Sequence, residues 1–423
     1  MERREFIKLV SAGAALAALP GCATTSGGRT IGRVVVVGGG YAGAAAAKYV
    51  RMWGPDIEVV LVERNAEFIS CPLSNRVLAG VMSIQDLTRG YDQLGSKHGV
   101  KVVQDEVLAV DADKRTLKLA QGDTLSYDRL IVAPGINFMY EAIPGLNSAE
   151  AQQKVLHAWK AGPETVALRK QLEAMPDGGV YALTIPKAPY RCPPGPYERA
   201  CQVAFYFKQH KPKSKVLILD ANEDIVSKKG LFTKAWKDLY PGIVEYRNNS
   251  ELVDVDAKTL TAKLQFDDVK ADVLNVVPPQ KAGKIAESAG LITANNRWCG
   301  VDFLSFESLA HKNIHVLGDS ILAAPAMPKS GHMSNQHAKV CAAAVVALMH
   351  GEQVNADPMI ANTCYSFVSD KEAVHVSSIH KYDTEKKTMV TVQGSGGLSS
   401  ASSDIEGQYA EAWAHNIWAD MLG

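Results

Sequence analysis

The 423-residue sequence has no excess of charge of either sign, because 45 lysines and arginines balance 45 aspartates and glutamates. It contains no run of basic residues. Its N-terminal apolar run, residues 9–19, is shorter than the about 20 residues that a membrane-spanning helix needs. We therefore expect no nucleic-acid partner, no anionic membrane surface as the main partner and no transmembrane span. The length allows two or three domains with buried cores.

Two patterns of metal and haem binding are also missing from the sequence. The 11 histidines show no ligand spacing such as His-Glu-x-x-His, so we predict no metal site. No Cys-x-x-Cys-His motif occurs, which excludes a covalent c-type haem on this chain. Cysteine is present seven times, at positions 22, 71, 192, 201, 299, 341 and 364, and spacing alone does not give their pairing.

Residues 1–29 have the order of an export signal. Arg3-Arg4 opens a twin-arginine-type pattern, an apolar run follows, and small residues come next. We therefore predict export of the folded chain to the periplasm, and the alternative is an amphipathic cytosolic start. Residues 19–22 resemble a lipoprotein box, so lipidation at Cys22 competes with plain cleavage after Ala23, which we favour.

A strand, a glycine-rich turn, a helix and a second strand then follow in the order of a dinucleotide-binding unit. The strand over 33–37 runs into GGGYAG (38–43), a helix is expected over 44–50, and a strand over 57–62 ends at Glu63. In this fingerprint Gly38 makes the turn, Gly40 admits the pyrophosphate and Gly43 allows close helix packing. Glu63, 25 residues after Gly38, is placed to bind ribose hydroxyls. The residues assigned to the cofactor here are Gly38, Gly40, Tyr41, Ala42, Gly43, Glu63 and Arg64.

The segment after this unit continues in strands. Residues 101–112 and 116–119 are expected to be strands, and residues 127–135 suit a strand that crosses beside a bound FAD. Ala133 and Gly135 would then line the cofactor. The alternative for this last piece is an ordinary buried strand that ends in a turn.

A later segment is expected to return to the same domain. A buried strand at 314–317 ends in Gly318-Asp319, where the aspartate would bond the ribityl chain or cap a helix. Lys329 and Ser330 then precede a helix expected over 334–349. The N-terminus of that helix would stabilise negative charge on a reduced flavin.

The middle region is similar to a second nucleotide-binding unit that has lost its phosphate loop. A strand at 179–185 leads to RCPPGPYER (191–199), with Cys192 and a double proline where glycines would be needed. Proline removes N–H donors, and bulky residues keep a pyrophosphate from approaching. Asp220 ends the next strand, where an acid could meet an NAD ribose, yet the glycines are missing, so we do not expect NAD(P) to bind.

From about residue 357 the sequence changes character. A hairpin is expected over 374–393, and a terminal helix carries Tyr409, Trp413, Ile417 and Met421 at a spacing of four, which we interpret as core packing rather than partner contact. The predicted fold class is α/β, with two Rossmann-like domains and a smaller α+β C-terminal domain. The predicted boundaries are 30–150 with 285–350 for the FAD-binding domain, 151–284 for the degenerate NAD-like domain and 351–423 for the C-terminal domain.

Taken together, these motifs resemble the flavoprotein subunit of flavocytochrome c sulfide dehydrogenase, a relative of the sulfide:quinone reductases and flavin disulfide reductases. The resemblance covers essentially the whole chain. It rests on the export signal, GGGYAG, Glu63, SCPLSN (70–75), RCPPGPYE (191–198), VPPQ (277–280), Gly318-Asp319, MPKS (327–330), NTCYS (362–366) and WADM (418–421). It implies that Cys71 holds FAD covalently through an 8α-S-cysteinyl thioether, against the alternative of a buried free cysteine.

By the same resemblance, Cys192 and Cys364 form a redox disulfide that oxidises sulfide to sulfur or polysulfide, with a plain structural disulfide as the alternative. Hydrosulfide would attack Cys192 and Cys364 would leave as a thiolate beside the flavin, although the opposite assignment stays open. Lys329 would stabilise the reduced flavin. Arg191 and Lys187 would draw in the anion or act as ordinary surface charges. The electrons would pass to a c-type cytochrome subunit in a heterodimer.

Three other functions remain as alternatives: a sulfide:quinone reductase, an oxidoreductase of another sulfur compound, and a flavin electron carrier without enzymatic activity. The polar residues of the tail, among them Glu411 and Asp420, and its lack of a strongly basic face argue against a membrane-bound quinone enzyme. Cys201 and Cys341 are interpreted as packing residues. Cys299 has no predicted role.

Overall fold

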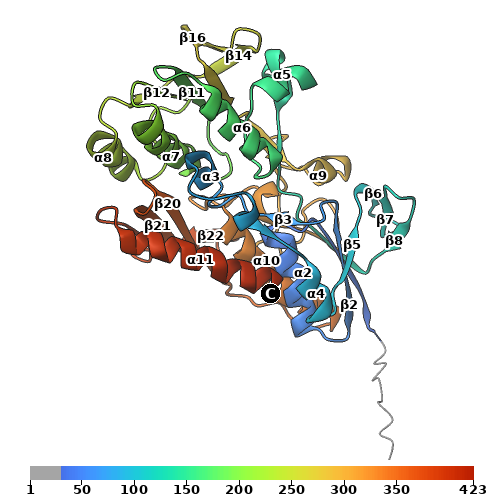
Figure 1. Ribbon diagram of the computed structural model, residues 1–423. Helices are drawn as coiled ribbons and strands as arrows, with labels where there is room; N and C mark the ends of the chain where they lie inside the picture. The colour runs from blue at the N-terminus through green and yellow to red at the C-terminus, as the bar shows by residue number, and fades with distance from the viewer. Residues whose placement is uncertain (1–29) are drawn as a thin grey trace, which may run out of the picture.

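The computed structural model describes residues 30–423, so the predicted export signal and Cys22 lie outside the described residues. The chain has the predicted α/β class, with two parallel sheets and an antiparallel C-terminal sheet (Figure 1). No helix within the described part of the chain is long and apolar enough to cross a membrane.

The first parallel sheet has the strand order β19-β9-β1-β2-β5. Its centre is β1 (Gly32–Val37), which pairs with β2 (Ile57–Glu63) and β9 (Arg129–Val132). The edges are β5 (Lys101–Gln104) and β19 (Ile314–Val316). The valines of β1 are buried, as both faces of a parallel sheet are covered. Because β19 joins β9, the chain returns to this sheet after the middle region.

Two helices pack against each other over this sheet, α2 (Tyr41–Trp53) and α10 (Gly331–Met349), as Figure 1 shows. Four consecutive alanines of α2, residues 44–47, are completely buried, and their small side chains allow the close approach. The helix α10 begins three residues earlier than expected, because the Ser330 hydroxyl accepts a hydrogen bond from the Met333 N–H (3.0 Å) and caps it.

The second parallel sheet has the order β13-β12-β11-β17. Its strands are β11 (Val180–Ile185), β12 (Lys215–Asp220), β13 (Val244–Arg247) and β17 (Val273–Val276). The helices of this region are α6 (Pro163–Ala174), α7 (Gly195–His210) and α8 (Lys229–Leu239). Cys201 on α7 and Cys341 on α10 are completely buried.

Short elements connect these layers. The strands are β3 (Phe68–Ile69), β4 (Thr88–Arg89), β6 (Val107–Asp111), β7 (Thr116–Leu119), β8 (Thr124–Ser126), β10 (Ile136–Phe138), β14 (Leu252–Asp256), β15 (Thr261–Leu264), β16 (Asp268–Lys270) and β18 (Gln280–Ala282). The short α-helices are α3 (Asn75–Ala79), α4 (Asp92–Ser96), α5 (Ala149–Lys154) and α9 (Lys284–Ser288), with four 3-10 turns at Gln85–Leu87, Tyr140–Ala142, Pro144–Leu146 and Gly318–Ser320.

The prediction of one strand over 101–112 is wrong. The chain forms β5 in the large sheet and β6 in a separate three-stranded sheet. The break lies at Asp105, a buried residue whose carboxylate accepts hydrogen bonds from the N–H groups of Glu106 (2.7 Å) and Gln121 (3.3 Å). A side chain that bonds nearby backbone groups in this way favours a turn over a continuous strand.

The C-terminal region is an antiparallel sheet covered by one long helix. The strands are β20 (Met359–Phe367), β21 (Ala373–Asp383), β22 (Thr388–Thr391) and β23 (Gly397–Leu398), and the helix is α11 (Asp404–Leu422). In Figure 1, α11 lies alongside this sheet and reaches α2.

The prediction that the stripe on α11 packs in the core is wrong for its first member. Tyr409 is 54% exposed and Trp413 is half-buried, whereas Ile417 and Met421 are buried. A spacing of four advances about 40° beyond a full turn, so four such positions drift around the helix. The buried face starts instead at Gly407 and continues through Ala410 and Ala414.

Candidate functional site

A cavity of about 720 Å³ opens at the carboxyl ends of β1, β2 and β9. Ligands bind open α/β sheets at this edge, and the volume is typical of a cofactor site. The loop before α7 and the strand β20 contribute Cys192 and Cys364 to the cavity lining. Of the predicted site residues, the lining includes Gly38, Gly40, Tyr41, Ala42, Glu63, Arg64, Cys71, Ala133, Gly135, Cys192, Gly318, Asp319, Ser330 and Cys364.

The glycine turn has the geometry that its three positions require. Gly38 has φ +98°, and a Cβ there would lie 2.5 Å from the Ala133 carbonyl oxygen. A Cβ on Gly43 would lie 1.7 Å from the Gly38 carbonyl oxygen, so this glycine allows the helix to meet the turn. A Cβ on Gly40 would meet nothing within 4 Å and would occupy cavity space. The turn therefore leaves room for a phosphate group at the N-terminus of α2.

The Glu63 carboxylate is fixed at the end of β2. One oxygen accepts a hydrogen bond from the Gly39 N–H (2.6 Å), and the other accepts from the backbone (2.8 Å) and the side chain (2.7 Å) of Asn65. Arg64, which is exposed, pairs with Glu106 at 3.5 Å. Both residues line the cavity.

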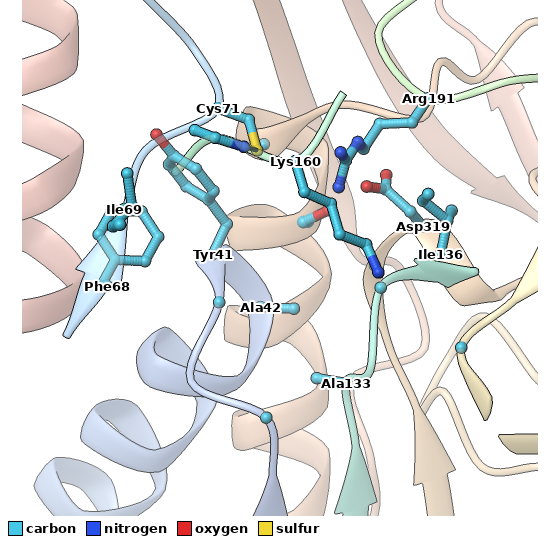
Figure 2. A pocket seen from close by; sticks show the side chains of 18 of the residues that line it. Tyr41, Ala42, Phe68, Ile69, Cys71, Ala133, Ile136, Lys160, Arg191 and Asp319 are labelled. Atoms are coloured by element: carbon cyan, nitrogen blue, oxygen red, sulfur yellow. Dashed lines mark hydrogen bonds between the residues drawn. The ribbon is translucent and has the colours of Figure 1, made fainter. Parts of the chain in front are cut away.

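Asp319 supplies a buried oxygen that no described residue binds. Its Oδ1 atom has no hydrogen-bond partner among residues 30–423, and its carboxylate faces the guanidinium of Arg191 (Figure 2). Burial raises the pKa of Asp319, while Arg191 and Lys329 lower it. Asp319 does not take the alternative role of a helix cap. The next helix, α10, is capped by Ser330, and the 3-10 turn that contains Asp319 begins after Leu317. An unpaired buried oxygen in a cavity fits a hydroxyl of a bound ligand, and with the space at Gly40 it fits FAD.

Cys71 faces the same cavity, in the loop that follows β3. Its sulfur accepts a hydrogen bond from the Ala161 N–H at 3.4 Å, and Figure 2 shows it beside Lys160. The loop is held by Tyr41, whose hydroxyl lies 2.7 Å from the Ser70 hydroxyl. Leu73, two residues later, has φ +71°. The thiol is therefore presented to the cavity, and a covalent bond to flavin stays a prediction.

Lys160 is a cavity residue with no predicted role. Burial, together with the nearby cations Arg191 and Arg64, lowers its pKa to about 8. Its ammonium group lies 5.4 Å from the ring centre of Phe138. In Figure 2 it extends across the cavity toward Ile136.

Cys192 lies in a strained backbone position just before α7. Its φ is +60°, a left-handed value that disfavours residues with a Cβ. Its N–H donates to the Lys329 carbonyl (2.8 Å), and its carbonyl accepts from the Gly195 N–H (2.9 Å). Burial raises the pKa of the Cys192 thiol, and so do Glu198 and Cys364, whereas Arg191 and Lys228 lower it. Non-glycine strain of this kind is retained where surrounding bonds impose it, often at functional sites.

Cys364 reaches the cavity from β20, 172 residues after Cys192. Its sulfur lies 3.4 Å from Nδ2 and 3.6 Å from Oδ1 of Asn362. Both cysteines are free thiols in this structure. The fold thus brings them to one cavity, and their pairing as a redox disulfide stays a prediction.

Lys329, which is predicted to stabilise the reduced flavin, is not among the residues that line the cavity, and that role stays a prediction. Its ammonium group donates to the carbonyl oxygens of Asp319 (2.9 Å) and Ile321, and it lies 3.7 Å from the ring centre of Trp298. Burial lowers its pKa to about 8. What meets the cavity is the N-terminus of α10, through Ser330, Gly331 and His332. Its partial positive charge remains available to a bound anion.

Comparisons with known proteins agree with this geometry. Residues 32–172 match the family model for pyridine nucleotide-disulphide oxidoreductases. Residues 165–278 match the central domain of the sulfide dehydrogenase [flavocytochrome c] flavoprotein chain, and residues 356–422 match the flavin-binding domain of flavocytochrome c sulphide dehydrogenase. The flavoprotein chain of that enzyme from Chlorobaculum thiosulfatiphilum is 58% identical over 45 residues, which are 94% of its sequence and 11% of this chain.

The chain belongs to the flavocytochrome c sulfide dehydrogenase flavoprotein family.

More distant relatives are sulfide:quinone oxidoreductases. The mitochondrial protein of Mus musculus is 25% identical over 307 residues, which span 68% of this chain and 65% of that protein. The sulfide-quinone reductase of Aquifex aeolicus is 23% identical over 351 residues, which span 78% of this chain and 80% of that protein. The solved structure of the Aquifex aeolicus sulfide:quinone oxidoreductase has a TM-score of 0.71 at 18% identity, covering 92% of this chain and 91% of that one, and shows the shared fold.

In this family member, the acid that would meet an NAD ribose is already used by the protein. Asp220 is completely buried and accepts hydrogen bonds from the hydroxyls of Tyr197 (2.7 Å) and Tyr246 (3.1 Å) and from the Asn222 N–H (2.9 Å). A ribose would have to displace both tyrosines. The second unit therefore lacks both features that NAD would need: the phosphate loop is replaced at Cys192, and the carboxylate that would bind the ribose is occupied by protein hydroxyls.

The two cations proposed for the entrance separate in the structure. Arg191 lines the cavity, and its guanidinium donates to the Trp159 carbonyl. Lys187 is exposed, is not among the lining residues, and pairs with Glu251 at 2.5 Å. Only Arg191 remains positioned to attract an anion.

Several cavity residues had no predicted role. Four of them lie in segments that the sequence analysis singled out, 70–75, 191–199 and 362–366, so their sequence positions were usable signals, whereas the others come from segments without a motif. These residues are Asn75, Trp159, Lys160, Glu198, Arg199, His332, Tyr365 and Trp413.

Proposed function

We propose that this chain is a periplasmic flavoprotein that oxidises sulfide at a Cys192–Cys364 disulfide and passes the electrons through FAD to a c-type cytochrome on another chain. The observation that carries the proposal is the meeting of two cysteines from different domains in one cavity whose remaining walls fit FAD. Membership of the flavocytochrome c sulfide dehydrogenase family supports it.

The protein groups that would hold FAD come from three elements. Gly40 leaves space at the N-terminus of α2 for the pyrophosphate, Glu63 is placed for a ribose, and Asp319 offers its unpaired oxygen. When bound, FAD would accept an electron pair from the dithiol and would release the electrons one at a time. The N-terminus of α10 would favour the negative charge that arrives with those electrons.

The sulfur chemistry follows from the two cysteines. Hydrosulfide attacks the Cys192 sulfur of the disulfide, a new S–S bond forms, and the electron pair of the Cys192–Cys364 bond leaves on Cys364 as a thiolate. A second hydrosulfide attacks the outer sulfur of the persulfide: a new S–S bond forms in the departing disulfane (HSSH), and the bond to Cys192 breaks with its electron pair on the Cys192 thiolate. Arg191, in the cavity lining, would attract each incoming anion.

We also propose that Cys71 forms a thioether with the flavin, because its sulfur faces the cavity. After acid precipitation of the purified protein, we expect the yellow colour to stay in the protein pellet. The variant Cys71→Ala should release its flavin to the supernatant. Complete release from the unmodified protein would contradict the covalent link.

A second hollow supports electron exit to a partner protein. His332, Tyr365 and Trp413 line both this hollow and the main cavity. The Trp413 ring centre lies 5.8 Å from that of His332 and 6.5 Å from that of Tyr365. The hollow opens between α10 and α11, where Tyr409 is exposed. These aromatic side chains therefore connect the flavin cavity to the surface.

The variant Trp413→Leu tests this exit. We expect it to slow cytochrome c reduction by about tenfold while sulfide still bleaches the flavin at nearly the normal rate. Trp53→Leu, on the exposed side of α2, is the matched control and should change neither rate. Equal cytochrome rates in all three proteins would contradict an exit at Trp413, and quinone reduction without cytochrome reduction would favour the sulfide:quinone alternative.

A further inference from the structure

A buried lysine of the second domain ends against the backbone of Cys364. Lys228, which precedes α8, is 5% exposed. Its ammonium group donates to the Cys364 carbonyl (2.7 Å), the Ser366 hydroxyl (2.9 Å) and the Val374 carbonyl (3.3 Å). All three acceptors are uncharged and belong to β20 and β21. Burying an ammonium group that is hydrogen-bonded only to neutral groups costs free energy, because the charge loses its water. An anion that forms nearby offsets this cost.

The backbone of Lys228 shows that this placement is imposed. Its φ is +56° and its ψ is +34°, in the left-handed region, where a residue with a Cβ is disfavoured. Such positions persist where the surrounding structure holds them, and they cluster at functional sites. Here the three bonds of the ammonium group hold the start of α8 against β20, which carries Cys364, and the neighbouring β21.

The carboxylates near this cation are already engaged. Glu198 accepts hydrogen bonds from the Phe367 N–H (2.9 Å) and the Asn75 side chain (2.8 Å). Glu406 pairs with His375 at 3.0 Å and accepts from the Ser399 hydroxyl (2.6 Å). The pKa of Lys228 is lowered to about 8, because burial lowers it by more than the nearby Cys364, Glu198, Cys192 and Glu406 raise it.

The surroundings of the two cysteines stabilise their thiolates in different ways. Burial and the carboxylate of Glu198 oppose a thiolate on Cys192, while Arg191 and Lys228 favour one. Cys364 has the ammonium group of Lys228 hydrogen-bonded to its own peptide. In thiol–disulfide exchange, the sulfur whose thiolate is better stabilised leaves faster.

We propose that Lys228 is the positioning residue whose charge stabilises the Cys364 thiolate, so that hydrosulfide attacks Cys192 and Cys364 departs. The inference rests on the proposed function and deepens it. Hydrosulfide forms a bond to the Cys192 sulfur, the Cys192–Cys364 bond breaks, and its electron pair stays on the Cys364 sulfur. The ammonium group offsets that charge, so no proton is needed for departure.

The test measures the alkylation of Cys364 in the reduced holoprotein by iodoacetamide over a series of pH values, with the modified peptides counted by mass spectrometry. The variants K228M and K228Q remove the charge, and K228Q keeps side-chain donors. K228R keeps the charge. The matched control is K211M, because Lys211 is also buried and also donates to backbone carbonyls, those of Glu173 and Met175.

We expect the pH of half-maximal alkylation at Cys364 to rise by roughly one to two units in K228M and K228Q, since loss of a nearby cation disfavours the thiolate. It should stay in place in K228R and K211M. An unchanged profile in either neutral variant, or an equal rise in K211M, would overturn the inference. Failure of both neutral variants to fold, with K211M folded, would give Lys228 a purely structural role and overturn it as well.

The same proteins separate this inference from the proposed function. If sulfide does not bleach the flavin of the unmodified protein, the proposed function fails, and the alkylation profile still decides whether Lys228 stabilises the thiolate. If sulfide bleaches the flavin and the alkylation profile does not move in K228M, only the inference fails.

Discussion

Replacing Cys364 with serine is expected to abolish flavin bleaching by sulfide, with a rate loss on the order of a thousandfold or more. The hydroxyl cannot form the disulfide with Cys192, so hydrosulfide has no sulfur–sulfur bond to attack. Cys192→Ser should give the same loss, because both thiols face the one cavity. Stopped-flow absorbance of the oxidised flavin after mixing with sulfide measures this.

The matched control is Cys201→Ala, since Cys201 lies on α7, is completely buried and is not among the residues that line the cavity. It should leave the bleaching rate nearly unchanged. Dithionite should reduce the flavin of every variant, which shows that the cofactor is present and reducible. Bleaching of Cys364→Ser at the normal rate would contradict the proposed mechanism and would favour a carrier that needs no disulfide.

Two glycine substitutions in the turn before α2 are expected to fail in different ways. In Gly43→Ala the new methyl group would lie 1.7 Å from the Gly38 carbonyl oxygen, and two backbone segments would have to separate. We expect a loss of stability of about 3 kcal/mol or more and a low yield of folded protein. In Gly40→Ala the methyl group meets no protein atom within 4 Å but occupies the cavity. We expect this protein to fold normally and to contain little flavin.

Thermal unfolding of the flavin-free forms and the flavin-to-protein ratio separate the two effects. Gly230→Ala is a control in open space outside the cavity lining, and it should leave the flavin content unchanged and should not lower the stability. A full complement of flavin in Gly40→Ala would contradict the placement of the pyrophosphate at this turn. Normal stability of Gly43→Ala would contradict the close packing of α2 on the turn.

The first nucleotide-binding unit was predictable because its information is local. Its β-branched strand, glycine turn and alanine-rich helix follow each other within about 30 residues, and the close contact that requires Gly43, with the Gly38 carbonyl, lies within the unit. The same local logic identified the altered loop at Cys192. The closed position at Asp220 was only half predictable, because Tyr246 reaches it from a different strand.

The charged groups around the thiols were not predictable, because their directions depend on contacts between distant segments. The ammonium group of Lys329 lies over the ring of Trp298, and Lys329 is not among the cavity-lining residues. Lys228 reaches Cys364, 136 residues later, through a backbone carbonyl that carries no sequence signal. The side chains of α11 show the same limit, since the sheet beneath it, and not the spacing of four, selects which face is buried.

The most direct measurement is an anaerobic titration of the purified flavoprotein with sulfide, followed by addition of an oxidised c-type cytochrome. The account predicts that sulfide bleaches the flavin with one electron pair per FAD, and that the cytochrome restores the oxidised flavin while it becomes reduced. Flavin that dithionite reduces but sulfide leaves oxidised would contradict the account.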